Sequence, residues 1–172
     1  DARKEHRWLV MIPLMFLIGK ELENKYVGII AAFFISISTA QIAQSTNLTS
    51  PSMCGIFSLM AALFFIRYIK KGTKLNAFLM AFFVATSINI HFQAIGLLIL
   101  LPVALVFGRK NIQNSLLLIL GTLIPFIPLI IFDIRNNFYE SSILIDYYLY
   151  GQHKVYNPNR WLTYAGVFWP NL

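Results

Sequence analysis

Charged residues are scarce in this chain, and their scarcity excludes an ordinary soluble domain. Asp, Glu, Lys and Arg make up 12% of the 172 residues, whereas hydrophobic residues make up 58%. Soluble domains are typically about 25% charged, because their surfaces face water. One soluble core of this size cannot hide so much apolar surface, so a lipid bilayer is the expected solvent.

Cysteine and the common cofactor motifs are also lacking. Cys54 is the only cysteine and lies in an apolar stretch, which excludes a disulfide framework and a thiolate metal site. The chain has no GxxxxGK, GxGxxG or HExxH motif, and its histidines lack the spacing of zinc ligands. Nucleotide and zinc chemistry therefore have no support, and no cofactor is identifiable.

The charge that is present is mostly positive and lies between apolar stretches. The net charge is +7, with basic clusters at residues 67–74 and 109–110. Cytoplasmic loops of membrane proteins have this distribution, because Lys and Arg gather on the inner side. A patch for nucleic acid would gather them on one surface instead. We therefore expect membrane lipid as a partner and no nucleic acid.

The apolar stretches predict an all-α, polytopic transmembrane helical bundle. A first stretch after Trp8 has only about a dozen residues, too few for the ~20 that cross a bilayer. Four longer stretches follow, at residues 27–44, 53–69, 75–107 and 114–132. We assign residues 1–135 to the membrane region and residues 136–172 to an aromatic-rich outer loop that leads into a further segment.

The stretch from residue 75 to residue 108 contains no charge, yet it holds a histidine at its centre. Lys74 and Arg109 flank it, and if both are cytoplasmic, the chain between them crosses the membrane an even number of times. Its 34 residues suffice for two short spans at ~1.5 Å per residue, which predicts a turn near His91. We expect His91 and Gln93 to line a wet outer cavity. Alternatively, His91 caps the hairpin by bonding a backbone group, and the two roles can coexist.

Asp133 and Arg135 follow directly on the last apolar stretch, whose Pro125 and Pro128 should bend it near one end. Counting the membrane crossings from the cytoplasmic Arg109 places both charges at the outer surface. An arginine there can hold a phosphate through two hydrogen bonds. The alternative is an interfacial arginine that pairs with Asp133. Tyr139 begins an aromatic cluster that extends to residue 161. Membrane-interface belts account for most such aromatic residues, and stacking on a sugar ring accounts for one or two.

Three segments, in this order, resemble bacterial membrane glycosyltransferases of the family 39 type. They are STNLTSPSMCGIFSLMAALFF, SINIHFQAIGLLILLP and PFIPLIIFDIRNNFYES, and the likeness covers roughly residues 8–145. That group includes the protein O-mannosyltransferases and the lipid A aminoarabinose transferases. The resemblance implies a GT-C fold in the bacterial plasma membrane. It also implies a polyprenyl-phosphate sugar donor, inversion at the transferred sugar, and an active site that faces outside.

The resemblance implies that a carboxylate in the first outer loop is the catalytic base. That loop should lie upstream of Asp1, so we expect a fragment that is inactive alone, with its catalytic residues unknown. The outer loop at residues 44–52 has no acid; its Asn47 suits sugar-hydroxyl recognition, or alternatively a local turn before Pro51. Some related enzymes use a divalent metal, although no residues here identify a site. Neither the sugar nor the acceptor is identifiable.

A membrane transporter or a lipid flippase subunit is the alternative class. Broken helices and an intramembrane histidine can mark a substrate path in such proteins. A transporter is expected to contain an internal repeat, and we find none in these 172 residues. The favoured hypothesis therefore remains a glycosyltransferase whose substrate-binding residues include His91, Gln93, Asn47, Asp133, Arg135 and Tyr139.

Overall fold

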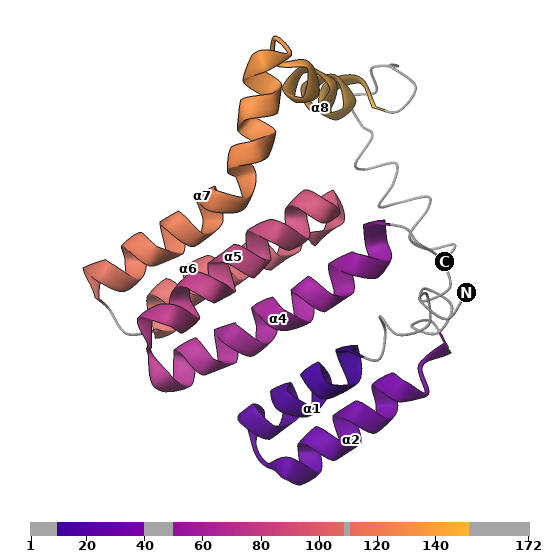
Figure 1. Cartoon of the computed structure of the whole chain (residues 1–172), viewed down its shortest axis with the longest axis vertical. Coiled ribbons are helices and arrows are strands. Elements are labelled where there is room, and N and C mark those ends of the chain that lie inside the picture. Colours follow the sequence, from indigo (N-terminus) through magenta and orange to yellow (C-terminus); the bar gives the residue numbers. More distant parts are fainter. Residues whose placement is uncertain (1–9, 40–49, 109–110, 152–172) are drawn as a thin grey trace. The chain divides into compact units, whose positions relative to one another are not determined.

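The computed structural model describes residues 10–39, 50–108 and 111–151, and its regular structure is helical throughout. These residues form seven α-helices and one 3-10 helix, which confirms the expectation of an all-α chain (Figure 1). The chain divides into two compact units, Asp1–Ile127 and Pro128–Leu172. The division falls at the proline pair of one long helix, where two adjacent turns each lack a backbone donor.

The first two helices, α1 (Met11–Leu22) and α2 (Lys25–Ser36), form a tight hairpin. Asn24 begins α2, and its side-chain oxygen accepts two backbone N–H bonds from the first turn at 2.9 and 3.1 Å. Gly19 and Gly28 face each other where the helices meet. A Cβ atom at Gly19 would lie 2.7 Å from the Gly28 Cα. The two backbones are therefore in direct contact, which only glycine allows.

Helix α2 is shorter than the apolar stretch at residues 27–44 predicts. It ends at Ser36, and Ile37 leaves the helical region with ψ near 1°. The Ser36 hydroxyl donates to the Phe33 carbonyl at 2.7 Å, a local bond that competes with the helical ladder. The helix of this stretch is therefore interrupted at Ile37, and residues 40–44 lie outside the described residues. Twelve residues rise about 18 Å, which is too short to cross a bilayer alone.

Helices α4 (Ser50–Lys71) and α5 (Lys74–Ile90) pack along each other and hold most of the core of the first unit. Gly72, with φ of 63°, supplies the left-handed turn between them. Small residues dominate the α5 face, so that the helices approach closely. The core residues at the turn end are Tyr68, Ala77, Met80, Ala81, Ala104 and Leu118. Those toward the opposite end are Ala61, Val84 and Ile88.

The predicted break near residue 91 is present. Helix α5 ends at Ile90, and His91 is extended, with φ of −152° and ψ of 113°. A 3-10 helix, η2 (Phe92–Ile99), and helix α6 (Leu100–Phe107) then lead back along α4 and α5. At the far end of this return, a Cβ atom on Gly108 would lie 2.4 Å from the Tyr68 ring. The charge-free stretch is therefore a hairpin, as its flanking cations predict.

Helix α7 (Ile112–Arg135) follows and contributes to both units. In the first unit, a Cβ atom on Gly121 would lie 2.5 Å from the Phe78 carbonyl oxygen, so α7 meets the α5 backbone there. In the second unit, the chain turns through Asn137 and Phe138, both left-handed, into α8 (Tyr139–Tyr150). Helix α8 lies within the segment that the sequence assigns to an outer loop.

Two helices are long and apolar enough to cross a membrane. They are the 19 residues Met53–Lys71 of α4 and the 24 residues Ile112–Arg135 of α7. Only 22% and 11% of the residues in their most apolar windows are buried. A helix that is apolar on nearly all sides is typical of a membrane span or of the core of a large protein. The described residues thus provide two candidate spans, flanked by the shorter apolar helices Lys25–Ser36, Lys74–Ile90 and Phe92–Phe107.

The hairpin makes a prediction about membrane topology. Lys74 and Gln93 are both exposed, and the 17 residues of α5 that separate them rise about 25 Å. In a Cys54→Ser background, we expect a membrane-impermeant thiol reagent added outside cells to label Gln93→Cys and not Lys74→Cys. After the cells are opened, both positions should react. Labelling of Lys74→Cys in intact cells would refute the orientation.

Candidate functional site

The break in the hairpin opens a groove of about 420 Å³ on the first unit. Its residues come from α4 and from the segment that follows the break. They are Cys54, Gly55, Ser58, His91, Gln93, Ala94, Gly96 and Leu97. Small side chains make up most of the wall, so the polar atoms of His91 and Gln93 are the main groups that could orient a ligand there.

The backbone of His91 forms the break between the two helices, and its side chain lines the groove. Its N–H donates to the Ser87 carbonyl at 2.9 Å, and its carbonyl accepts from Ala94 at 2.9 Å. The imidazole makes no capping hydrogen bond to the 3-10 helix. The imidazole therefore does not cap the hairpin, which was the alternative that the sequence left open. Its ring is partly exposed and lines the groove, together with the exposed Gln93.

The other polar residues around the break bind backbone carbonyls. Ser87 is fully buried, and its hydroxyl donates to the Phe83 carbonyl at 2.8 Å. Asn89 donates from its side-chain nitrogen to the Pro125 carbonyl at 2.7 Å and so links the end of α5 to α7. Side chains on both faces of α5 thus have partners here, which removes the cost of showing polar groups to lipid.

Cys54 and Ser58 line the groove, although the sequence analysis did not include them among the site residues. They lie four residues apart on α4 and so share one face of that helix. The Cys54 sulfur lies 3.7 Å from the Ser58 oxygen and 3.7 Å from the Ser87 carbonyl oxygen. Their i, i+4 spacing indicated that they share one face of an apolar helix. Nothing in the sequence indicated that this face lies beside His91.

Asp133 caps helix α8. The residue is only 7% exposed, and its Oδ1 accepts from the backbone N–H of Glu140 at 2.8 Å and of Ser141 at 3.3 Å. The Ser141 hydroxyl donates to the other carboxylate oxygen. Both oxygens are therefore engaged in holding the turn between α7 and α8.

Arg135 lies in a second concave surface, of about 590 Å³, on the second unit. Pro128, Ile131, Phe132 and Asn136 line it with Arg135. Among the described residues, the guanidinium has no hydrogen bond and no ion pair, so it does not pair with Asp133. Its five donors are available to an anionic ligand. Tyr139 is exposed; its backbone N–H donates to the Asn136 carbonyl at 3.2 Å, and its carbonyl accepts from the Ser142 hydroxyl at 2.8 Å.

The predicted site residues thus fall into three groups. His91 and Gln93 share the first groove, and Arg135 lies in the second. Asp133 and Tyr139 lie outside these two lining sets, at the turn that begins α8. Asn47 is outside the described residues. No three His, Cys, Asp or Glu side chains in the described ranges are arranged to hold a metal ion.

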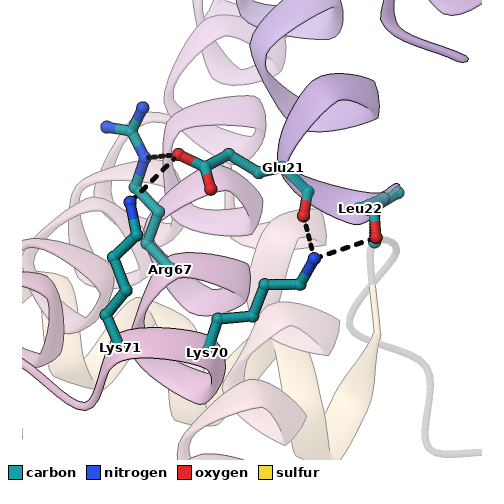
Figure 2. A network of polar contacts seen from close by, with 5 residues as sticks. All are labelled: Glu21, Leu22, Arg67, Lys70 and Lys71. Atoms are coloured by element: carbon teal, nitrogen blue, oxygen red, sulfur yellow. Dashed lines mark hydrogen bonds and ion pairs between the residues drawn. The ribbon is translucent and has the colours of Figure 1, made fainter. Parts of the chain in front are cut away.

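A polar network joins the C-terminal ends of α1 and α4 (Figure 2). Arg67 donates from Nε to Glu21 Oε1 at 2.8 Å, and the Lys71 ammonium lies 3.5 Å from the same oxygen. Lys70 donates to the backbone carbonyls of Glu21 and Leu22 and so satisfies the end of α1. The sequence analysis used these cations only as markers of the inner side.

The network sets the ionisation of Glu21. Partial burial raises the pKa of this carboxyl, but the hydrogen bond from Arg67 and the positive charges of Lys71 and Arg67 outweigh burial. The pKa therefore lies below its ordinary value, and Glu21 stays ionised at neutral pH. Because the folded-state pKa is lowered, this pairing contributes stability above the unfolded-state pKa and is lost as pH falls through the folded-state value.

Comparisons with protein-family models, with curated proteins and with solved structures find no match to this chain.

Proposed function

We propose that this protein is an integral-membrane glycosyltransferase that moves a sugar from a polyprenyl-phosphate carrier to an acceptor at the extracytoplasmic face. One observation carries the proposal: a charge-free apolar hairpin is broken at His91, and the break opens a groove with two polar side chains. Polar groups among membrane-spanning helices are costly unless they line a wet cavity or bind a ligand. The ordered resemblance of three segments to family 39 enzymes supports the same function.

The chemistry divides among a base, a phosphate-binding group and groups that bind the sugar. An acceptor hydroxyl attacks the anomeric carbon, its proton passes to a base, and the bond from that carbon to the phosphate oxygen breaks. Arg135 suits the phosphate, because its guanidinium is unpaired among the described residues and can bind two oxygens at once. His91 and Gln93, in the separate groove of the first unit, suit sugar hydroxyls as hydrogen-bond donors.

The two grooves supply no carboxylate to act as the base. Neither groove is lined by an acidic side chain, and both oxygens of Asp133 already accept hydrogen bonds. The resemblance assigns the base to a carboxylate in the first outer loop of the family. Asp133 is then a positioning residue, because it holds the turn that follows Arg135.

Consumption of lipid-linked sugar tests the function. We expect membranes that contain the intact protein to release polyprenyl phosphate from labelled polyprenyl-phosphate sugars, and control membranes from cells without the protein to release none. A transporter or flippase would instead move the labelled lipid across the bilayer of proteoliposomes and leave its sugar–phosphate bond intact. Movement without cleavage would contradict the transferase and favour the alternative.

A further inference from the structure

Arg67 in the α1–α4 network has hydrogen-bonding capacity that the protein does not use. Its Nε binds Glu21, but its two outer nitrogens have no partner among the described residues, and they lie away from the Glu21 carboxylate (Figure 2). The Glu21 bond restrains the guanidinium, and the centre of the Phe64 ring lies 5.8 Å from its central carbon. The two outer nitrogens are a planar fork of two donors, a geometry that matches two oxygens of a phosphate.

Positive charge around this fork exceeds negative charge. In the described part of the chain, Glu21 is the one carboxylate paired with Arg67 and Lys71, and Lys70 binds the carbonyls at the end of α1. Lys71 is 57% exposed and makes only a loose pair with Glu21 at 3.5 Å. A second anion beside Arg67 and Lys71 would balance the excess without displacing Glu21.

The position of the fork favours a lipid headgroup over a free anion. The apolar span Met53–Lys71 ends at this cluster, so in a bilayer its cations lie at the depth of the headgroups. The side chain of Leu22 is 55% exposed, beside the carbonyl that Lys70 binds, and offers apolar surface to an acyl chain. A basic pocket between helices on the inner side of a membrane is a common site for anionic lipid.

We propose that Arg67 and Lys71 form a binding site for the phosphate of an anionic phospholipid in the cytoplasmic leaflet, with Glu21 as the residue that positions Arg67. The site rests on the membrane placement of the proposed function but not on the transfer reaction. If the protein binds anionic lipid here but transfers no sugar, the lipid site stands and the proposed function is wrong. If it transfers sugar without selecting anionic lipid, the proposed function stands and the lipid site is wrong.

Lipid binding to the purified intact protein tests the site. In detergent, native mass spectrometry with dioleoyl phosphatidylglycerol or dioleoyl phosphatidylcholine gives the apparent affinity for each. We expect phosphatidylglycerol to bind about tenfold more tightly, which is typical of a charge-assisted contact. Arg67→Lys should lower that affinity about tenfold, because lysine keeps the charge and loses the fork. Glu21→Gln keeps an acceptor for Nε and removes the competing negative charge, so it should raise the affinity.

Lys25→Gln is the matched control, since Lys25 is an exposed cation at the same end of the bundle and lies outside the network. It should change the affinity less than twofold. If Arg67→Lys fails to fold, Lys71→Gln replaces it, because this exposed side chain should weaken binding without disturbing the core. Equal affinities for the two lipids would overturn the site, as would equal losses in Arg67→Lys and Lys25→Gln. Displacement of the lipid by equimolar inorganic phosphate would identify a site for free phosphate instead.

Discussion

Arg135→Ala is expected to slow sugar transfer by roughly ten- to a hundredfold, because one charge-assisted contact to a phosphate is worth about 1.5–3 kcal/mol. The guanidinium has no protein partner in the described residues, so the substitution breaks no internal bond and should leave the folded yield unchanged. Arg135→Lys should recover only part of the rate, because a single ammonium cannot bind two oxygens in one plane. The rate is measured as release of polyprenyl phosphate by membranes that contain the intact protein.

Two substitutions of His91 are expected to reduce the rate of sugar transfer to different extents. His91→Gln keeps a donor of similar size, so it should lose less activity than His91→Ala. Lys25→Ala removes an exposed cation outside both grooves and serves as the control for a general effect of charge. Normal turnover in Arg135→Ala would exclude Arg135 from phosphate binding, and normal turnover in His91→Ala would exclude His91 from substrate binding. Activity lost together with folded protein would assign them a structural role.

The hairpin could be predicted from the sequence because its signals are local and independent. Lys74 and Arg109 bound a stretch too long for one span, and polar residues at its centre occur on both faces of a helix. Either signal alone predicts a turn near His91, and the extended backbone of that residue agrees. Hydropathy also predicted α4 and α7 closely, since each is a long apolar run between polar or charged residues.

The end of α2 and the role of Asp133 could not be predicted, because each depends on a few local bonds. Hydropathy continues past Ser36, but the backbone leaves the helix there, and an apolar count does not detect a serine that binds the helical backbone. Asp133 stands two residues before Arg135, which suggests an ion pair. The carboxylate instead accepts bonds from residues seven and eight positions later, and only the left-handed turn through Asn137 and Phe138 brings them within reach.

The groove required knowledge of which helices meet. His91 and Gln93 could be proposed from their placement in an apolar stretch. Their neighbours Cys54 and Ser58 come from another helix, and no alternation or spacing in the sequence relates residue 54 to residue 91. In the sequence, small residues such as Gly55 and Gly96 indicate close helix packing. In the structure, they line the groove.

Gly28→Ala is expected to have the largest effect on folding of any single-methyl addition to the α1–α2 hairpin. The new Cβ atom would lie 2.5 Å from the Phe16 carbonyl oxygen and 3.1 Å from the Lys20 nitrogen. Both are backbone atoms of α1, so the clash cannot be relieved by a side-chain rotation and must separate the helices. Overpacking usually costs about 1–3 kcal/mol, and a contact with backbone belongs at the upper end of that range. The helical preference of alanine over glycine offsets only about 1 kcal/mol of this cost.

Gly96→Ala provides the matched control, because a Cβ atom there meets nothing within 4 Å. Thermal unfolding of the purified protein in detergent should show a clear loss of stability for Gly28→Ala and little change for Gly96→Ala. The separation of α1 from α2 should also disturb the α1–α4 network, since Glu21 lies one turn beyond Phe16 on the same helix. Gly28→Ala should therefore reduce phosphatidylglycerol binding even at temperatures where the protein stays folded, whereas Gly96→Ala should leave it intact. Unfolding of both variants at the temperature of the unmodified protein would refute the close contact between the two helices.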